Sequence, residues 1–501
     1  MGRVLIVGGG LVALALSVIL ARYRVPATIL TRDPARPHNS AGNSSGGFAW
    51  LPPGLDLLDW LGLAEGFVRQ GSWRSGHELW SGGRRRLVLP YARPDTPHGQ
   101  ALDLPEHQAE ALLEAAALAT GLVEIRRGHA PAALLSWDGE AGLRVRGPEG
   151  EYEIAADYAV ACGPEGAVLR DWLGIPVEID DLGVDALAAD LETTEDQPLG
   201  RSRLVLDCVR PHAFFPFAAR RIRFLTSVNP GEKVGFSVAP QRMAVLVRAL
   251  RPDIAVRRVL WSHPARQRAL HSRRFRRGRW LLAGEAANTI DAAGGAHQQF
   301  GLMGAWRLGW RLALAAQGHA RGSALLDDYD REQRATTEAV RRGAFPDLPD
   351  LGLRSRASVA VRTLVLGIAD RLPFLARRLA EATALESRTL PMAGSADRPY
   401  DGPWRMPGRI GPWRGGARLP AAAFAGVPPG NAEIGLRHLI LPVGQCDPAQ
   451  EASLARALRD RLQVPGIAVD AGADAPWRVR GGPPALALIR PDRRVVALYS
   501  V

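Results

Sequence analysis

A run of three glycines near the start of the chain, Gly8-Gly9-Gly10, has the spacing of a phosphate-binding turn. The run follows the apolar segment Val4–Val7 and precedes a longer apolar stretch, which together predict a buried strand, a tight turn and a helix. Such a turn lets phosphate oxygens approach the backbone, while the helix directs its N-terminal amides and positive dipole end towards them. Ala13 fills the third small position of the pattern G-x-G-x-x-G/A. The predicted phosphate contacts are Gly8, Gly10, Leu11 and Val12.

A dinucleotide site of this kind usually has an acidic side chain at the end of the second strand, about 20 residues further on, that binds the adenosine ribose. Thr31 occupies that position and is followed by Arg32 and Asp33. One uncharged hydroxyl oxygen cannot accept from both ribose hydroxyls as a carboxylate does. Thr31 and Arg32 are still the contacts that we predict here, because Asp33 lies beyond the expected end of the strand.

The apolar N-terminal stretch has two alternative interpretations, a signal peptide and a membrane span. The triple glycine interrupts the stretch, and Arg22 and Arg24 follow it without a small-x-small cleavage site, which disfavours a signal peptide. The stretch is too short and too rich in glycine for a membrane span. We therefore expect a cytoplasmic protein without an integral membrane segment.

The composition of the 501-residue chain narrows the class of protein further. This length suits roughly two to four domains. The three cysteines are widely spaced, which excludes a disulfide framework and a cysteine-based metal site and fits a reducing compartment. The net charge is +12, and basic side chains cluster at 84–86 and 266–279. These clusters lack interleaved aromatic residues, so an anionic cofactor explains them better than a nucleic acid.

Patterns of apolar and turn-forming residues locate the elements that would position these groups. Helices are predicted at 55–63, 106–118, 166–173, 301–317 and 450–462, and strands at 123–126, 142–146, 152–161, 203–207, 222–228, 280–284, 436–443 and 485–489. From about 182 to 260 the pattern predicts mostly short strands and turns, as in an antiparallel sheet that covers a substrate. Trp306 and Trp310 are four residues apart on one predicted helix and are expected to belong to the core.

Residues 278–313 have the sequence GRWLLAGEAANTIDAAGGAHQQFGLMGAWRLGWRLA. Together with the N-terminal unit, this stretch resembles the FAD-dependent aromatic hydroxylases (class A flavoprotein monooxygenases), especially those that tailor aromatic polyketides. Their corresponding stretch runs GRVFLAGDAAH, a proline-bearing loop, GGQGLN and a helix with a tryptophan, and the two align without gaps. The resemblance extends over nearly the whole chain, and the final segment looks like the thioredoxin-like tail of this family.

The resemblance implies where FAD would bind beyond the first turn. The segment Gly284-Glu285 takes the place of the family's glycine and aspartate, so Glu285 would contact the ribityl chain, although a carboxylate that satisfies amides at a helix start is an equal interpretation. The next turn would supply backbone amides to the pyrimidine edge of the flavin, aided by a helix N-terminus. The residues implied there are Gly294, Gly295, Ala296 and His297.

Other family positions differ in this sequence. The arginine of the helix that contacts FAD appears as Gln108, and the D-G motif has become Cys162-Gly163-Pro164-Glu165-Gly166, in which Pro164 removes a backbone donor. His297 is the one candidate catalytic residue, as an acid, a base or a hydrogen-bonding group, and a polar loop residue is its plainer interpretation. The residues expected to line a substrate cavity are Phe214, Phe215, Pro216 and Phe217, for which aromatic packing alone would look the same.

The function that the resemblance implies is an FAD-binding oxidoreductase that hydroxylates a small aromatic or polycyclic substrate, with NAD(P)H as the reductant. The changed motifs leave a second hypothesis open, a non-redox or FAD-deficient descendant that acts as a cyclase, isomerase or accessory protein in secondary metabolism. A scaffold protein held by the thioredoxin-like tail is a third class without positive support. No motif bears on the oligomeric state.

The expected architecture is α/β, with a Rossmann-like FAD-binding domain and an inserted antiparallel-sheet substrate domain. The FAD-binding domain is expected at 1–180 and 270–345, with part of the substrate sheet from about 70–105, and the substrate domain at 181–269. A helical segment at 346–395 and a linker at 396–416 lead to the thioredoxin-like domain at 417–501. A single cysteine in the tail, Cys446, cannot cycle as a dithiol, so this domain is expected to be structural.

Overall fold

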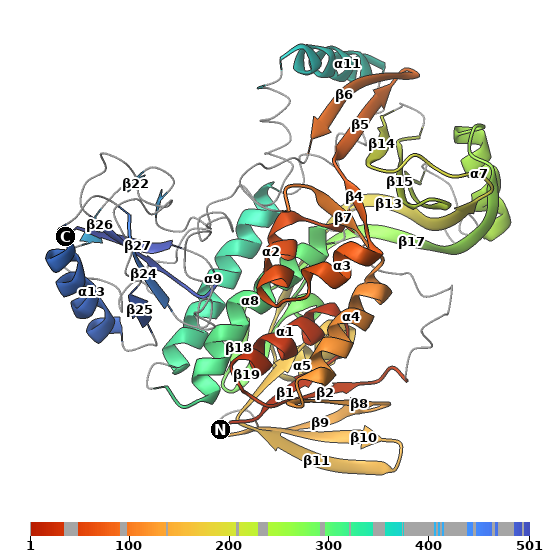
Figure 1. Cartoon of the computed structure of the whole chain (residues 1–501). Coiled ribbons are helices and arrows are strands. Elements are labelled where there is room, and N and C mark those ends of the chain that lie inside the picture. Colours follow the sequence, from red (N-terminus) through yellow and green to blue (C-terminus); the bar gives the residue numbers. More distant parts are fainter. Residues whose placement is uncertain are drawn as a thin grey trace.

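The computed structural model describes most of the first two thirds of the chain and parts of the last third. The described residues are 2–34, 49–90, 98–136, 139–206, 210–228, 239–290, 296–319, 322–343, 356–372, 374, 405–406, 409–410, 413–414, 438–443, 447–462, 466–468, 485–492 and 495–500. The fold is mixed α/β, and sheets at the two ends of the chain flank a long central pair of helices (Figure 1).

A six-stranded sheet in the order β18-β19-β12-β1-β2-β8 carries the N-terminal turn. Its five strands from β19 to β8 are parallel, and β18 is antiparallel to β19. The strands are β1 (Val4–Val7), β2 (Ala27–Thr31), β8 (Val123–Arg127), β12 (Tyr158–Ala161), β18 (Arg276–Arg277) and β19 (Trp280–Leu282). All four residues of β1 are at most 1 % exposed, as expected for a parallel strand that is covered on both faces.

Helices cover both faces of this sheet. On one face α1 (Leu11–Arg22) packs between α4 (Glu106–Ala119) and α8 (Ala296–Ala316), and on the other lies α5 (Gly163–Trp172) with the three-stranded sheet of β9 (Ala130–Ser136), β10 (Ala141–Gly147) and β11 (Gly150–Ala156). The segment predicted as one strand at 152–161 is therefore two strands, β11 and β12, in different sheets. The chain turns between them at Asp157, whose carboxylate accepts a hydrogen bond from the Arg3 amide at 2.7 Å.

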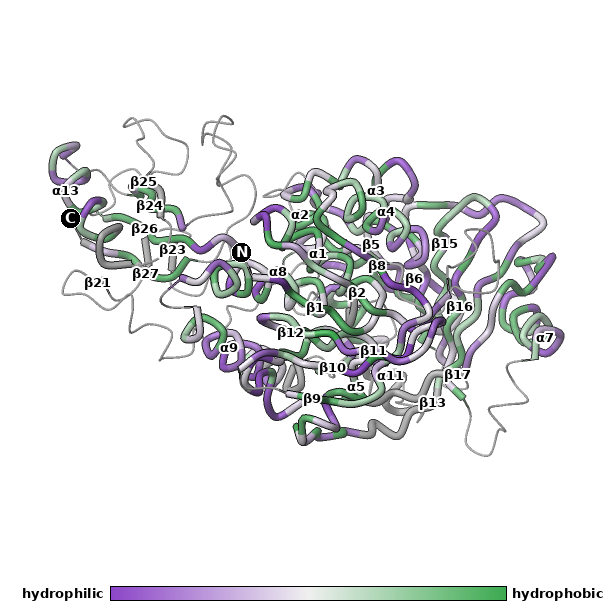
Figure 2. Tube along the Cα trace, turned by 90° about the horizontal axis from the view of Figure 1, so that it is seen from below, coloured by the Kyte–Doolittle hydropathy of each residue, from purple (hydrophilic) through white to green (hydrophobic). Residues whose placement is uncertain are grey.

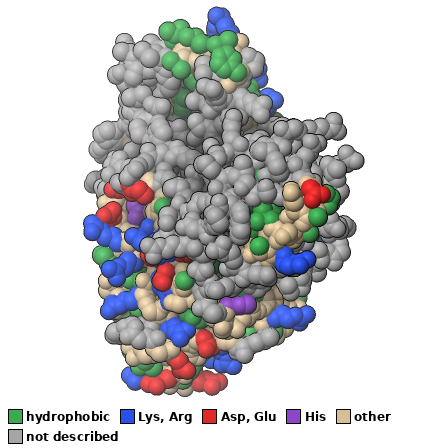
Figure 3. Space-filling model, turned by 90° about the vertical axis from the view of Figure 1, so that its left-hand side faces the viewer, with side chains coloured by type: hydrophobic (Ala, Val, Ile, Leu, Met, Phe, Trp, Pro, Cys, Tyr) green, Lys and Arg blue, Asp and Glu red, His purple; other side chains and the backbone are tan. Residues whose placement is uncertain are grey.

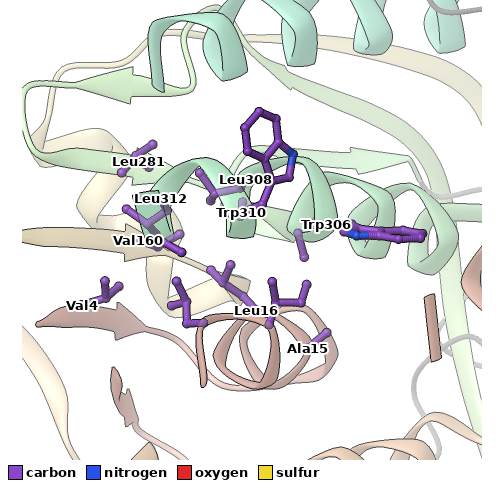
Figure 4. Close-up of a cluster of buried hydrophobic side chains, with 14 of the residues drawn as sticks. Val4, Ala15, Leu16, Val160, Leu281, Trp306, Leu308, Trp310 and Leu312 are labelled. Carbon is purple, nitrogen blue, oxygen red and sulfur yellow. The ribbon is translucent and has the colours of Figure 1, made fainter. Parts of the chain in front are cut away.

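Helix α8 fits closely against α1 because its contact surface carries glycine. A Cβ atom on Gly309 would stand 2.5 Å from Ile19 Cγ2, so a larger residue would push the two helices apart. Leu308 and Leu312 of α8 lie on the side of Val160 and Leu281, while Trp310 points away from them (Figure 4). Both tryptophans of this helix belong to the core, as predicted: Trp306 stacks on Trp60 at 5.4 Å, and Trp310 meets His438 edge-on at 5.3 Å.

An eight-stranded sheet in the order β20-β17-β13-β16-β15-β14-β5-β6 forms the second large layer. Its strands are β5 (Gly76–Ser81), β6 (Arg84–Pro90), β13 (Val177–Thr193), β14 (Arg201–Val205), β15 (His212–Ala218), β16 (Arg221–Ser227), β17 (Val256–Ser272) and β20 (Asn288–Ile290). The prediction of mostly short strands from about 182 to 260 fits β14, β15 and β16 but not β13 and β17, which have 17 residues each, and it missed the helix α7 (Pro240–Leu250) before β17. A register shift between Asp181 and Asp185 lies within β13.

Smaller elements join the two large sheets. A three-stranded sheet in the order β3-β7-β4 consists of β3 (Ala49–Trp50), β7 (Ala101–Asp103) and β4 (Ser72–Arg74), and the helices α2 (Pro52–Trp60) and α3 (Ala64–Gln70) lie beside it. Helix α11 (Arg356–Arg371) packs Leu366 and Ala369 on the apolar side chains of β5 and β6. Its outward residues Leu364, Val365 and Ile368 are exposed, and hydrophobic side chains gather at this end of the molecule in Figure 3.

The C-terminal part of the chain forms a five-stranded sheet in the order β21-β27-β26-β24-β25, with helix α13 (Pro448–Leu462) beside it. The strands are β21 (Arg405–Met406), β24 (His438–Pro442), β25 (Gly466–Ala468), β26 (Ala485–Ile489) and β27 (Val495–Ser500), and two further short strands, β22 (Arg409–Ile410) and β23 (Trp413–Arg414), pair with each other. Because β21 pairs with β27, the segment predicted as a linker also contributes a strand to this sheet.

This sheet lies beside α9 (Gly322–Gly343), an amphipathic helix (Figure 1). In Figure 2 much of α9 is hydrophilic, whereas the strands around β1 are hydrophobic. The polar residues of α9 therefore include groups that the C-terminal sheet can contact.

Candidate functional site

The glycine turn after β1 touches the end of β12. Gly8 has φ +103°, and a Cβ atom on it would stand 1.8 Å from the carbonyl oxygen of Cys162. The first glycine is therefore required for the close approach of two backbone segments. Gly10, with φ +90°, is different, because the nearest atom to its added Cβ is Glu110 Oε1 at 3.4 Å. The open side of the turn is at Gly10, which is where a phosphate could approach.

The first turn also lies against the second predicted cofactor segment. A Cβ atom on Gly284 would stand 3.0 Å from Val12 Cγ2, and one on Gly301 would stand 2.8 Å from the same methyl group. Val12 thus packs between the short 3-10 helix η1 (Gly284–Ala286) and α8. Two segments that are about 270 residues apart in the sequence meet here, as the sequence predicts for a site that encloses one dinucleotide.

A pocket opens between the glycine turn, the end of β2, β8 and one face of α4. Its floor is apolar, and its rim carries both acidic and basic groups. The lining residues are Gly9, Gly10, Leu14, Ile29, Thr31, Asp33, His107, Glu110, Ala111, Glu114, Ile125 and Arg127. An apolar slot beside a phosphate-binding turn is the environment that an adenosine group requires. The adenosine diphosphate half of FAD therefore fits here. Its diphosphate would lie at the open side of Gly10, and its adenosine would lie in this pocket.

The residues at the end of β2 differ from the prediction. Thr31 is 3 % exposed, and its hydroxyl oxygen would lie 2.9 Å from a Cβ atom on Gly9. Its hydroxyl donates to Glu165 Oε1 at 3.4 Å and accepts from the Asp33 amide at 3.3 Å. Arg32 is exposed and does not line the pocket, whereas Asp33 does. The sequence analysis favoured Arg32 over Asp33, but of the two only Asp33 lines this pocket.

Helix α4 contributes residues that the sequence analysis missed. Gln108 lies on this helix but does not line the pocket, which is lined by His107, Glu110, Ala111 and Glu114 instead. Their spacing of three, four and seven residues puts them on one helix face, a signal that was present in the sequence. Glu114 forms an ion pair with Arg127 of β8, which fixes the far wall of the pocket.

The flavin-side segments are only partly described. Glu285 is exposed on η1, at the edge where Val12 contacts Gly284. Gly294 and Gly295 lie outside the described residues, and Ala296 and His297 begin α8 without described side chains. The roles assigned to these residues, including the catalytic role of His297, stay predictions.

The altered D-G motif is compatible with a working site. Pro164 lies in the first turn of α5, where a helix needs no backbone donor, so its missing N–H does not disrupt the fold. Cys162 is fully buried, and burial raises the pKa of its thiol far above the ordinary range. A thiol in this state is inert. The carboxylate of Glu165 accepts a hydrogen bond from the hydroxyl of Thr31 at the end of β2.

The four residues predicted to line a substrate cavity do not share one face of β15. Phe214 packs under α7 with Phe224, at a ring distance of 5.0 Å. Neighbouring residues of a strand point to opposite faces, and Phe215 accordingly contacts Arg74 at 5.1 Å and His77 at 6.1 Å on the other side. The prediction for Phe214 is wrong, because this ring belongs to the core between the sheet and α7.

The face that carries Phe215 holds buried charges that the sequence analysis did not find. Arg223 donates two hydrogen bonds to Asp190, at 2.7 and 2.9 Å, and Arg74 forms an ion pair with Asp103 at 2.9 Å. Burial raises the pKa of Asp103 to about 6, against the opposite effect of the two guanidinium groups. Burial, followed by the charge of Arg74, lowers the pKa of His77, which is hydrogen bonded to Ser202.

None of the described helices is long and apolar enough to cross a membrane. The described parts of the chain contain no group of three or more His, Cys, Asp or Glu side chains placed to hold a metal ion.

Comparison with known proteins places this geometry in a family. Residues 1–344 match the family described as FAD binding domain. The 12-dehydrotetracycline 5-monooxygenase/anhydrotetracycline 6-monooxygenase of Streptomyces rimosus is 31% identical over 302 residues, which cover 58% of this chain and 58% of that enzyme. The match thus spans less than two thirds of the length of this curated relative.

Two solved structures cover almost the whole chain. OxyS anhydrotetracycline hydroxylase from Streptomyces rimosus has a TM-score of 0.72 and 26% sequence identity, over 99% of this chain and 96% of that one. Aklavinone-11 hydroxylase, in a ternary complex with FAD and aklavinone, has a TM-score of 0.69 and 20% identity, over 100% and 96% of the two chains. The second likeness shows the fold alone.

Proposed function

The chain belongs to the FAD binding domain family, and from this premise we propose that it is an FAD-dependent monooxygenase that hydroxylates an aromatic or polycyclic substrate, with NAD(P)H as the reductant. The observation that carries the proposal is the contact of Val12 with Gly284 and Gly301, which brings the phosphate-binding turn to the segment expected to hold the flavin. The names of the similar enzymes, a dehydrotetracycline and anhydrotetracycline monooxygenase and an anhydrotetracycline hydroxylase, support the same activity.

Residues of three regions would hold FAD. The turn at Gly10 and the N-terminal amides of α1 suit the diphosphate, and the pocket between β2, β8 and α4 suits the adenosine. Gly284 and Glu285 lie where the ribityl chain would pass, and the residues before α8 would meet the ring. When bound, the flavin supplies electron transfer and the activation of oxygen, which no side chain of the protein can perform.

The protein's own residues would bind the substrate and keep water away from it. The face of the eight-stranded sheet that carries Phe215 provides an aromatic surface, backed by the ion pairs of Arg223 and Arg74. Because both guanidinium groups are already paired, they can fix the shape of the surface without binding a free anion. Asp103 of β7, which is paired with Arg74 beside this face, has its pKa raised by burial to about 6 and could hold or release a proton near neutral pH.

The non-redox alternative is less well supported. It rests on the aspartate missing from the D-G motif, on Pro164 and on the altered loop before α8. Pro164 occupies a helix position that tolerates proline, which weakens one of these three objections. Asp33, which lines the nucleotide pocket two residues after Thr31, also favours a nucleotide site.

We assign the C-terminal sheet to the thioredoxin-like type. The order β27-β26-β24-β25, in which β24 is parallel to β25 and antiparallel to β26, supports this assignment. The buried contacts of Trp310 with His438 support a structural role for the domain, as the single cysteine of the tail also does.

The visible spectrum of the purified full-length chain tests the proposed function. We expect the absorption of oxidised flavin, bleached by a reductant, and NAD(P)H oxidation that a polyphenolic compound accelerates. A colourless protein that takes up no added FAD would refute the proposal. A flavoprotein that no aromatic compound stimulates would retain the cofactor assignment and refute the monooxygenase assignment.

A further inference from the structure

The end of β2 lacks the carboxylate that a ribose usually requires, and the structure provides another one nearby. Thr31 is the last residue of β2, and Asp33 follows it in a bend. Both residues line the same pocket, together with Gly9 and Gly10 of the phosphate-binding turn. Either side chain could therefore meet the adenosine ribose of a bound nucleotide, and their surroundings distinguish them.

Thr31 already uses its hydroxyl group within the protein. The hydroxyl proton is donated to Glu165 Oε1 at 3.4 Å, and the oxygen accepts the Asp33 amide at 3.3 Å. Its side chain is also pressed against Gly9, whose added Cβ would stand 2.9 Å from Thr31 Oγ1. A hydroxyl group has one proton and two lone pairs, so this buried group can offer a ribose one acceptor site at most.

Asp33 has the properties that Thr31 lacks. Its residue is exposed at the pocket rim, and a carboxylate can accept hydrogen bonds from both hydroxyls of a ribose. The bond from its own amide to Thr31 fixes the start of the bend, so the hydroxyl of Thr31 controls where the Asp33 carboxylate stands. Glu165, from the segment after β12, in turn holds the hydroxyl of Thr31.

We propose that Asp33 binds the adenosine ribose of the cofactor and that Thr31 and Glu165 are positioning residues for it. This proposal rests on the proposed FAD site. The acidic residue is thus two positions beyond the end of β2, and the strand-end position itself is occupied by Thr31, whose hydroxyl is hydrogen bonded within the protein. Glu110 also lines this pocket, and Arg127 balances the charge of Glu114, so the acidic side chains of Asp33 and Glu110 favour a ribose with free hydroxyls over one with a 2′-phosphate.

The test measures dissociation constants for FAD and for an FAD analogue whose adenosine lacks both ribose hydroxyls. The full-length protein should bind FAD about tenfold to a hundredfold more tightly than the analogue, the range expected for hydrogen bonds to a charged group. Asp33→Asn should lose most of this preference, because its affinity for FAD falls while its affinity for the analogue does not. Asp196→Asn, an exposed aspartate paired with Arg220 on the substrate sheet, is the matched control and should behave like the wild type.

Variants of Thr31 test the positioning role. Thr31→Val removes the hydroxyl at nearly constant shape, and we expect a severalfold loss of the preference for FAD over the analogue. Thr31→Ser keeps the hydroxyl and should restore the preference, which a role of the threonine in packing alone would not explain. If Asp33→Asn retains the full preference, the assignment of Asp33 is wrong. If the wild-type protein binds neither compound, the proposed function itself fails.

Discussion

Gly10 is the residue at which the N-terminal turn opens towards the pocket. Gly10→Asp would direct a carboxylate at the diphosphate, and like charges a few ångströms apart near a protein surface repel by several kcal/mol. We therefore expect FAD affinity to fall on the order of a hundredfold or more, measured by titration of the purified protein with FAD.

Gly62→Asp is a suitable control for this variant. Gly62 has φ +75°, similar to the +90° of Gly10, but an added Cβ meets nothing within 4 Å, and the residue lies outside the nucleotide pocket. The control introduces the same charge at another glycine with positive φ, away from the pocket. Stoichiometric flavin in the Gly10 variant, or equal loss in both variants, would contradict the role of the turn.

The raised pKa of Asp103 predicts that the free energy of unfolding depends on pH. The folded protein raises the pKa of this carboxyl group to about 6 from 3.8, so between these values the folded state binds more protons than the unfolded state. Its contribution to the free energy of unfolding is therefore present at low pH and is lost as the pH rises through about 6. The full change is about 2–3 kcal/mol.

The measurement compares the wild type with Asp103→Asn in urea unfolding from pH 4 to 7. The asparagine variant cannot titrate, so the stability of the wild type relative to it should fall as the pH rises. In the variant Arg74 faces a neutral amide at every pH, much as it faces a neutral acid in the wild type at low pH, so the change of the difference with pH reports the ionisation of Asp103. A difference that does not change with pH would show that Asp103 titrates normally.

Residue-level signals in the sequence predicted the cofactor class and missed part of its contacts. The glycines and the segment around Gly284 are local patterns, and the structure brings them together. Asp33 was passed over because the rule places the acidic group at the strand end, and only the hydrogen bonds of Thr31 reveal the shift. The ion pairs of Asp190 and Asp103 join residues far apart in the sequence, which no local pattern marks.

At the scale of elements, the packing of α8 on the N-terminal turn holds the two cofactor segments together. Glycine within a helix costs about 1 kcal/mol relative to alanine, so Gly301 is retained for a reason outside helix propensity. That reason is the side chain of Val12, which occupies the place of the missing Cβ.

We expect Gly301→Ala to destabilise the protein by about 1–3 kcal/mol, because the new methyl group would stand 2.8 Å from Val12 Cγ2. Adding Val12→Ala should recover much of the loss, since the two groups compete for one space. Denaturant unfolding of the single and double variants measures this coupling. Gly367→Ala on α11, where an added Cβ meets nothing within 4 Å, should instead stabilise by up to about 1 kcal/mol. Additive effects of Gly301→Ala and Val12→Ala would contradict the contact.

Element types were predicted better than element lengths. The strand at Val4–Val7 and the helix at Glu106–Ala119 have strong periodic patterns, and the structure places them as expected. The pattern from 182 to 260 predicted mostly short strands, whereas β13 runs through 17 residues with register shifts inside the sheet. The assignment of all of Phe214 to Phe217 to one cavity failed for a simpler reason, because a strand alternates its faces.

At the scale of the whole molecule, a buried ion-pair network joins the C-terminal sheet to the central helices. Arg490, which follows β26, donates to both oxygens of Glu332 on α9 at 2.8 and 3.0 Å, and Arg311 of α8 donates to the same carboxylate at 2.6 Å. Arg490 also donates to Asp492 at 2.9 Å. Burial opposes the charge of Glu332, yet the two guanidinium groups hold the pKa of its carboxyl well below the ordinary value.

Arg490→Met should therefore destabilise the protein by about 3–5 kcal/mol, because it leaves buried carboxylates without their main partner. The loss should appear in thermal unfolding, together with faster proteolytic release of the C-terminal domain. Arg334→Met removes a half-exposed arginine that pairs with Asp330 on the same helix, and its effect should stay below about 1 kcal/mol. Equal effects of the two variants would mean that the C-terminal contact contributes no more than a surface pair.

The shared carboxylate of Glu332 has a consequence for the construction of chimaeras. A tail exchanged from a related enzyme would bring its own residue to the position of Arg490 and meet a recipient helix that still carries an acidic group and a second arginine. If the exchanged tail has no basic residue at the position of Arg490, the buried carboxylate of Glu332 loses a partner. A graft that transfers the tail together with α8 and α9 keeps Arg490, Arg311 and Glu332 from one parent.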